Sequence, residues 1–157
     1  MTEQLESERS SSLATEPNWF EYSVRAHPHH TDFAGIVWHG TYIAWMEEAR
    51  VEYLRASGIE FADLVAVGCD LPVVELSVRY HQSMGMGTSA VVKAYMEPPS
   101  GVRLNWKYQI RSPDGQILYL SAIVTLVAVD RQKGKIMRRL PPSLERILAD
   151  RSTAGES

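Results

Sequence analysis

The sequence predicts an α+β domain of two layers, in which one long central helix is wrapped by a curled antiparallel sheet of five strands. Three observations lead to this class. An alternating run of apolar and polar residues comes first, a stretch with helical periodicity follows at residues 40–57, and four further alternating runs come after it. Short turns join the later runs, and short connections favour antiparallel neighbours.

The size and composition of the chain fit one soluble domain. Its 157 residues are enough for a hydrophobic core, and contents of 45% hydrophobic and 22% charged residues are ordinary for a globular protein. We expect a single domain over residues 18–150. The net charge of −3 gives no overall attraction to nucleic acid or to an acidic membrane. A single cysteine, Cys69, excludes a disulfide within the chain.

The two ends of the chain are expected to lie outside this domain. Residues 1–17 are polar and rich in serine and glutamate, which is typical of a disordered tail and not of a signal peptide. Residues 151–157 are expected to fray. No apolar run is long enough to span a bilayer, and the lone cysteine fits a reducing compartment, so we expect a cytoplasmic protein.

The first strand and the long helix follow from their periodicities. Residues 19–26 alternate between apolar and polar, and Pro28 ends this strand because it lacks a backbone donor. From residue 40 to residue 57 the apolar residues recur at helical spacing, and Gly58 is a suitable stop. The width of the apolar stripe predicts that a sheet wraps this helix. Its members are Ile43, Trp45, Met46, Ala49, Tyr53, Leu54 and Ala56.

Each of the four later alternating runs is predicted to be a strand. They cover residues 71–80, 89–97, 102–111 and 117–129. The last run is apolar on both faces, which favours a central place in the sheet. Residues 59–70 form a looser segment with a short helical turn, and Pro141 and Pro142 can open a terminal helix through Asp150.

The segment His30–Tyr42, with the sequence HTDFAGIVWHGTY, carries the chemistry. Asp32 lies upstream of the predicted helix, Gly35 breaks the loop between them, and residues 39–41 fall at the helix start. The first N–H groups of a helix have no intrahelical acceptor and carry the positive end of its dipole. A carbonyl oxygen resting on them would be polarised beside a carboxylate, which suits acyl transfer.

The pattern Asp-x-x-Gly-x-Val-x-His-x-x-Tyr, followed by a long helix and four strands, resembles the hotdog-fold acyl-CoA thioesterases. The similarity is greatest to the 4-hydroxybenzoyl-CoA thioesterases and the Tol–Pal-associated acyl-CoA thioesterases. It spans residues 19–140 in the order of elements, and residues 31–42 carry most of its specificity. The sequence Ala-Gly-Ile-Val-Trp at residues 34–38 is especially close to the 4-hydroxybenzoyl-CoA enzymes.

The resemblance implies hydrolysis of an acyl-CoA thioester to a free acid and CoA, with no cofactor and no metal. It implies a homodimer or homotetramer with sites at the interface between protomers. It assigns catalysis to Asp32 and to His39, whose backbone N–H would hold the thioester oxygen. The residues that it places around the substrate are Gly35, Trp38, Gly40 and Tyr42.

The chain departs from the family pattern at two positions. Many relatives carry a second aspartate two residues before the catalytic one, where this chain has His30. A Gly-Asp pair often begins the third strand of relatives, whereas Gly87 is followed here by Thr88. The motifs do not locate the contacts to the CoA phosphates. A basic run could hold them or could be a solvated strand end, and it comprises Arg131, Lys133, Lys135, Arg138 and Arg139.

Structural interpretations of the same residues stay open. Asp32 could cap the approach to the helix or bond its own loop; as a catalyst it could attack the carbonyl and form a mixed anhydride, or activate a water. His39 could act through its imidazole or only through its N–H. Trp38, Tyr42 and Trp45 could be core or pocket wall, and Cys69 a small buried residue.

Three rival functions compete with the thioesterase. The first is a metallohydrolase, since such enzymes also cleave thioesters. Four of the five histidines lie in residues 27–39, but their spacing is not a standard zinc arrangement, so we expect no metal site. A hotdog hydratase or dehydratase would act on acyl thioesters without releasing CoA. A non-catalytic acyl-CoA-binding module would bind the same ligand without turnover.

Overall fold

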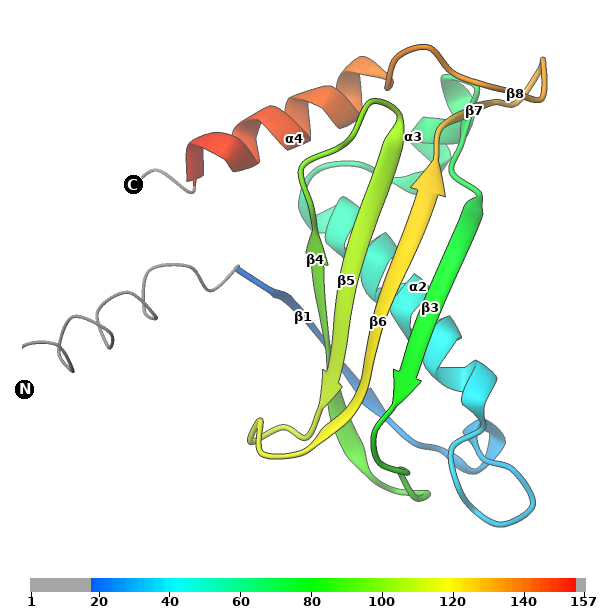
Figure 1. The fold of residues 1–157 in the computed structure, drawn as a ribbon, viewed down its shortest axis with the longest axis vertical. Coiled ribbons are helices and arrows are strands. Elements are labelled where there is room, and N and C mark those ends of the chain that lie inside the picture. The colour runs from blue at the N-terminus through cyan, green and yellow to red at the C-terminus, as the bar shows by residue number, and fades with distance from the viewer. Residues whose placement is uncertain (1–17, 155–157) are drawn as a thin grey trace, which may run out of the picture.

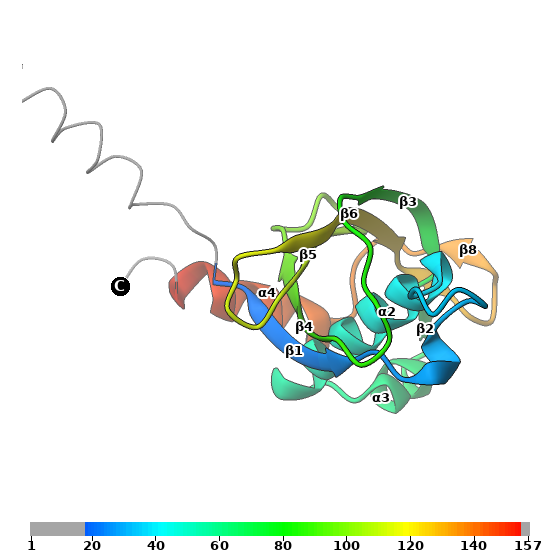
Figure 2. The same ribbon diagram turned by 90° about the horizontal axis from the view of Figure 1, so that it is seen from below.

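The computed structural model of the protein describes residues 18–154, and side chains are described through Ala149. The expected tail at residues 1–17 and the last three residues lie outside this range. Five strands form one antiparallel sheet in the order β1-β4-β5-β6-β3. Helix α2 (His39–Ala56) crosses one face of the sheet (Figure 1), and the sheet curls around it (Figure 2). This arrangement confirms the predicted α+β hotdog architecture.

The strands and helices have the following bounds. The large sheet contains β1 (Phe20–Arg25), β3 (Val73–Tyr80), β4 (Ser89–Met96), β5 (Arg103–Arg111) and β6 (Leu118–Val127). A small second sheet joins β2 (Cys69–Asp70), β7 (Val129–Asp130) and β8 (Lys135–Ile136). The remaining helices are the 3-10 turn η1 (Pro28–His30), α3 (Phe61–Ala66) and α4 (Pro142–Ala154). Helix α4 runs four residues beyond the predicted end, and no described helix could span a membrane.

The core lies between α2 and the concave face of the sheet. The inward-facing residues of β4 and β5 are buried as their alternation predicts: Ala90, Val92, Ala94, Met96, Leu104, Trp106, Tyr108 and Ile110. Most of the predicted stripe of α2 packs against them, since Trp45, Met46 and Tyr53 are almost fully buried. The prediction is wrong for Ile43 and Ala56, which are exposed because the first lies at the flank of the stripe and the second ends the helix.

The pairing of the strands differs from chain order at one place. Strands β4, β5 and β6 pair in sequence, but β3 pairs with β6 at the far edge and β4 pairs with β1. The predicted adjacency of β3 and β4 is therefore wrong, whereas β6 lies inside the sheet between β5 and β3, as its two apolar faces predict. The connection from β3 to β4 instead bonds to residues on either side of the Asp32 loop, with Gly87 N–H donating to the Ala26 carbonyl at 2.7 Å.

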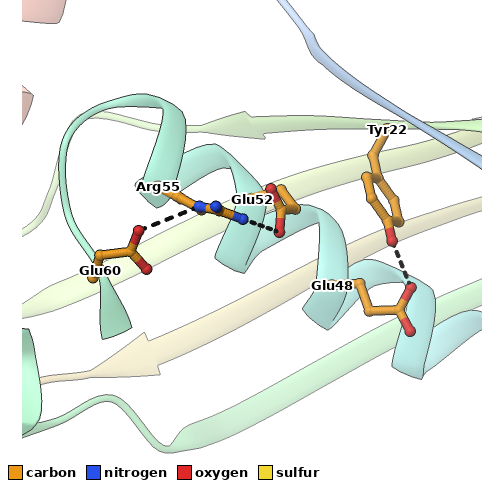
Figure 3. Close-up of polar contacts among 5 residues, drawn as sticks. All are labelled: Tyr22, Glu48, Glu52, Arg55 and Glu60. Atoms are coloured by element: carbon orange, nitrogen blue, oxygen red, sulfur yellow. Dashed lines mark hydrogen bonds and ion pairs between the residues drawn. The ribbon is translucent and has the colours of Figure 1, made fainter. Parts of the chain in front are cut away.

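Polar contacts on the outer side of α2 tie it to neighbouring elements (Figure 3). The Tyr22 hydroxyl of β1 donates to a Glu48 carboxylate oxygen at 2.9 Å, and burial together with this carboxylate raises the pKa of Tyr22. Near the C-terminal end of α2, Arg55 pairs with Glu52 at 3.7 Å and with Glu60 at 3.2 Å. These side chains are largely solvated, so the ion pairs orient the helix end more than they stabilise it.

Candidate active site

The segment before α2 folds into a small hairpin. Thr31 and Val37 form an antiparallel bridge, and the Asp32 N–H donates to the Ile36 carbonyl at 2.8 Å. The turn closes when the Gly35 N–H donates to the Asp32 carbonyl at 3.1 Å. Gly35 has a φ of +75°, a left-handed conformation that side chains disfavour, so glycine suits this position. Gly35 therefore shapes the loop that presents Asp32.

The Asp32 carboxylate is exposed and half engaged by its own loop. Its Oδ1 accepts the N–H of Ala34 at 2.9 Å and the N–H of Ile36 at 3.2 Å. This is the self-bonding loop that the sequence left as one interpretation. Its Oδ2 has no hydrogen-bond partner within residues 18–154. The loop thus fixes the direction of the carboxylate while one oxygen stays available for chemistry.

The start of α2 is left without a capping side chain. Its N-cap residue is Trp38, which makes no side-chain cap bond, although serine, threonine, aspartate or asparagine is usual there. Within the described part of the chain the N–H groups of His39 and Gly40 have no acceptor, while the N–H of Thr41 donates to the Trp38 carbonyl at 2.9 Å. Two amides at the positive end of an 18-residue helix are therefore free to receive an oxygen atom.

Contacts from outside the helix hold this uncapped turn in place. The His30 carbonyl accepts both the Trp38 N–H at 3.0 Å and the Thr41 hydroxyl at 2.9 Å. From the end of β3, the Tyr80 hydroxyl donates to the His39 carbonyl at 2.9 Å. Burial raises the pKa of Tyr80, so its hydroxyl stays protonated and able to donate at neutral pH.

The β3–β4 connection packs against the hairpin and forms the wall of a cavity. The Val37 N–H donates to the Met84 carbonyl at 2.8 Å, and the Met86 N–H donates to the Gly35 carbonyl at 3.0 Å. Beside them lies an open cavity of about 220 Å³. It is lined by Ile36, Val37, His39, Tyr42, Tyr80, His81, Gln82 and Ser83. The cavity therefore joins the helix start to the end of β3.

The structure places the predicted site residues in two groups. His39 and Tyr42 line the cavity, while Gly35, Trp38, Gly40 and the exposed Asp32 do not line it. Trp38 is 53% exposed, so it is not core, and its ring lies so close over Gly40 that a Cβ at Gly40 would come within 2.2 Å of it. Tyr42 is buried, and burial raises its pKa.

Two residues of the site, Tyr80 and His81, were missed in the sequence. Tyr80 contacts the ring of Tyr42 with centroids 5.7 Å apart, and Nε2 of His81 lies 2.8 Å from the Ser121 hydroxyl. Both residues sit at the end of a strand whose alternation indicates only a sheet residue. The residues to which they hydrogen-bond lie 40 or 41 positions away in the chain, so a local sequence pattern cannot predict these contacts.

A histidine cluster lies beside the hairpin and a basic cluster lies apart from it. The rings of His27, His29 and His30 pack on one another next to the hairpin, but no three His, Cys, Asp or Glu side chains among the residues described are placed so that they could hold a metal ion. The five basic side chains from Arg131 to Arg139 are all exposed, at or near the β7–β8 hairpin. Figure 1 places that hairpin at the opposite end of the sheet from the start of α2.

Comparisons with known proteins identify the family of the chain. The sequence model of the thioesterase-like superfamily matches residues 26–148. A Synechocystis protein named as an inferred esterase is 52% identical over 84% of this chain and 80% of its own length. The acyl-CoA thioester hydrolase YbgC of Escherichia coli is 29% identical over 80% of this chain and 92% of its own length.

Solved structures show the same fold. A DHNA-CoA thioesterase from Staphylococcus aureus superposes with a TM-score of 0.79 at 26% identity, covering 88% of this chain and 93% of that one. A 1,4-dihydroxy-2-naphthoyl-CoA thioesterase from Synechocystis superposes with a TM-score of 0.78 at 22% identity, covering 85% and 97%. The superfamily match covers the hairpin, α2 and four of the five strands of the large sheet, leaving out only β1. The chain therefore belongs to the thioesterase-like superfamily of hotdog-fold hydrolases.

Proposed function

We propose that the protein hydrolyses acyl-CoA thioesters, with Asp32 as nucleophile or general base and the helix-start amides as the site for the carbonyl oxygen. Membership of the superfamily and the acyl-CoA thioester hydrolases among its relatives support the reaction class. The observation that carries the residue assignment is the uncapped start of α2, whose free N–H groups follow a hairpin that presents a half-free carboxylate.

Thioester hydrolysis needs a nucleophile or general base and a donor for the carbonyl oxygen, which the Asp32 carboxylate and the helix-start N–H groups would supply. As the carbonyl carbon is attacked, negative charge develops on its oxygen, and the N–H groups of His39 and Gly40 would stabilise that charge. Asp32 would supply Oδ2 to the carbon and form a mixed anhydride, which water then opens, or it would take the proton of an attacking water. In both routes the C–S bond breaks and the CoA thiolate leaves with the electron pair.

The other predicted residues would shape the substrate site. Gly35 would keep the hairpin in its turn, and Gly40 would leave room for Trp38 to lie over the helix start. Tyr42 would form part of the cavity wall, and the exposed His39 ring would lie at its mouth. His39 would act through its N–H, since its ring makes no hydrogen bond within residues 18–154 that would orient it as a base.

A homodimer is part of the proposal. Strand β3 is one of the two edge strands of the described sheet (Figure 1), and it exposes Val73, Val74 and Leu76 by 40–52%. A free apolar edge is a template for another strand. Antiparallel pairing of two β3 edges would bring the start of one α2 towards the opposite end of the partner's sheet, where the basic β7–β8 hairpin lies. The exposed basic run would then be available to CoA phosphates.

The acyl group is proposed only as a class. Relatives of similar fold are named as thioesterases of aromatic acyl-CoAs, including DHNA-CoA. The cavity of about 220 Å³ is large enough for one ring or a short chain. We place the reaction in the cytoplasm, because the only cysteine, Cys69, is a free and buried thiol.

The test is to incubate the protein with a panel of acyl-CoA thioesters and to measure the release of free thiol. We expect turnover with at least one of acetyl-, hexanoyl-, benzoyl-, 4-hydroxybenzoyl- and 1,4-dihydroxy-2-naphthoyl-CoA. Asp32→Asn keeps an Oδ1 for the Ala34 and Ile36 N–H groups, so the loop and acyl-CoA binding should persist while kcat falls by about two orders of magnitude or more.

The matched control is Asp114→Asn. Asp114 Oδ1 also accepts a backbone N–H, from Gln116 at 3.0 Å, but it lies in the turn between β5 and β6, outside the hairpin, the helix start and the basic run. Its variant should keep the wild-type kcat. Saturable binding of the panel without thiol release would indicate a binding module, and conversion of enoyl thioesters without thiol release would indicate a hydratase.

A further inference from the structure

We infer that Tyr80 is a positioning residue for thioester hydrolysis, because its hydroxyl holds the first peptide of α2 in the orientation that keeps its amides free for the substrate. The inference rests on the proposed function, since it assigns the helix start to the carbonyl oxygen. Tyr80 lies at the end of β3, and its hydroxyl donates to the His39 carbonyl at 2.9 Å.

A helix start that binds substrate cannot be capped in the usual way. An N-cap side chain would accept the N–H of the second or third helical residue and would occupy the positive end of the dipole. Trp38 makes no such bond, so the first turn lacks the cap that normally keeps it from fraying. Tyr80 replaces the cap by holding a carbonyl, which leaves the His39 and Gly40 amides without a protein partner in the described chain.

The same bond acts on the electronic state of one amide. The His39 carbonyl and the Gly40 N–H belong to a single peptide unit, so a donor on the oxygen withdraws electron density from the nitrogen. Chains of hydrogen bonds strengthen one another by this polarisation. Tyr80 therefore makes the Gly40 N–H a better donor to the oxyanion as well as fixing its direction.

The surroundings of Tyr80 favour this specific role. Its ring packs on the ring of Tyr42, with centroids 5.7 Å apart, and that side chain is buried in the core. The His81 N–H, next in the chain, donates to the Tyr119 carbonyl at 2.8 Å, which fixes the strand end. The hydroxyl thus approaches α2 from a rigid support.

The test compares Tyr80→Phe with Tyr22→Phe. Each variant deletes one hydroxyl that donates to α2 at 2.9 Å, but the Tyr22 partner is the side chain of Glu48 in the middle of the helix (Figure 3). With 4-hydroxybenzoyl-CoA and the best substrate of the panel, we expect kcat of Tyr80→Phe to fall about three- to tenfold with KM unchanged. Tyr22→Phe should keep both constants.

A spectroscopic arm separates this inference from the proposed function. In amide ¹H–¹⁵N spectra, Tyr80→Phe should move the Gly40 resonance upfield in the proton dimension, and Tyr22→Phe should leave it in place. An unmoved Gly40 resonance, a change in KM alone, or equal losses of kcat in both variants would each overturn the inference. A wild-type protein inactive on the whole panel would refute the proposed function, whereas the Gly40 shift would still decide whether Tyr80 holds this peptide.

Discussion

Asp32 builds its own loop and is also free to take the catalytic role that we propose for it, two interpretations that the sequence presents as alternatives. Its Oδ1 bonds the loop, which is the structural interpretation, and its Oδ2 is free of protein partners in residues 18–154, which is what catalysis needs. A nucleophile gains from such division because the bonded oxygen fixes the geometry of the other one. Under the proposed function, a single residue would therefore both build the loop and carry the chemistry.

His30 stands where many relatives of the resembled family have an aspartate, and here it closes a turn. Its Nδ1 accepts the His27 N–H at 2.9 Å, which requires an unprotonated Nδ1. Burial lowers the pKa of His30, and the neighbouring rings of His29 and His27 lower it further. The neutral imidazole is thus the form that the folded chain selects.

This selection predicts a loss of stability in acid. The unfolded chain binds a proton at His30 more readily than the folded chain. The free energy of unfolding therefore increases as the pH rises through the range near 6.5, and it decreases again as the pH is lowered through that range. We expect Tm to drop between pH 8 and pH 5.5, and His30→Asn, which keeps an acceptor for His27, to drop less. His81→Asn serves as the control; if it flattened the profile equally, the assignment to His30 would fail.

At the scale of elements, the site is a junction of three segments with different tasks. The hairpin presents the carboxylate, α2 presents its free amides, and the β3–β4 connection supports the hairpin through backbone bonds to Gly35 and Val37. The connection is irregular because it must leave β3 at one edge and enter β4 beside β1. The crossing of the sheet is what brings Tyr80 to the helix start.

The turn of the hairpin gives a prediction on stability. Gly35 has a φ of +75°, and a Cβ added there would meet no atom closer than 4.0 Å, so Gly35→Ala is strained by its backbone alone. We expect a loss of about 1–2 kcal/mol in the free energy of unfolding, measured by urea denaturation. Gly85→Ala is the control, since Gly85 bridges to Ile36 without a positive φ and has open space around it. An equal loss there would show that the positive φ of Gly35 is not the cause.

The elements differ in how far the sequence predicts them. Strand alternation predicts the burial of β4 and β5, and helical periodicity places α2 within one residue at each end. The pairing of β3 with β6 was not predictable, because short connections favour adjacent strands and only tertiary packing excludes that solution here. Tyr80 was missed for the same reason, since its partner lies 41 residues away. The motif identified Asp32 and His39, whose catalytic roles stay predictions.

At the scale of the whole molecule, the two edge strands of the described sheet differ in the side chains that they expose. Strand β1 at one edge carries polar residues outward, whereas β3 at the other exposes Val73, Val74 and Leu76. Near the start of β3 lies a second cavity of about 220 Å³, lined in part by Val51 and Phe61 of α2 and α3. A protein rarely leaves an edge strand with exposed apolar side chains to water, so we expect the edge to pair with a second copy.

Dimerisation at β3 makes a prediction that separates assembly from folding. Leu76→Asp puts a charge on the exposed edge strand, so it should shift sedimentation in analytical ultracentrifugation from dimer or tetramer towards monomer at micromolar concentration, while circular dichroism stays that of the wild type. Ser23→Asp, at an exposed position of the opposite edge strand β1, should leave the mass unchanged. If activity needs basic groups from the partner, the monomer should also lose affinity for acyl-CoA, seen as a rise in KM that becomes smaller as protein concentration increases. A Leu76→Asp protein that keeps its oligomeric mass would refute the β3 interface, and one that is monomeric with an unchanged KM would show that each site is complete within one chain.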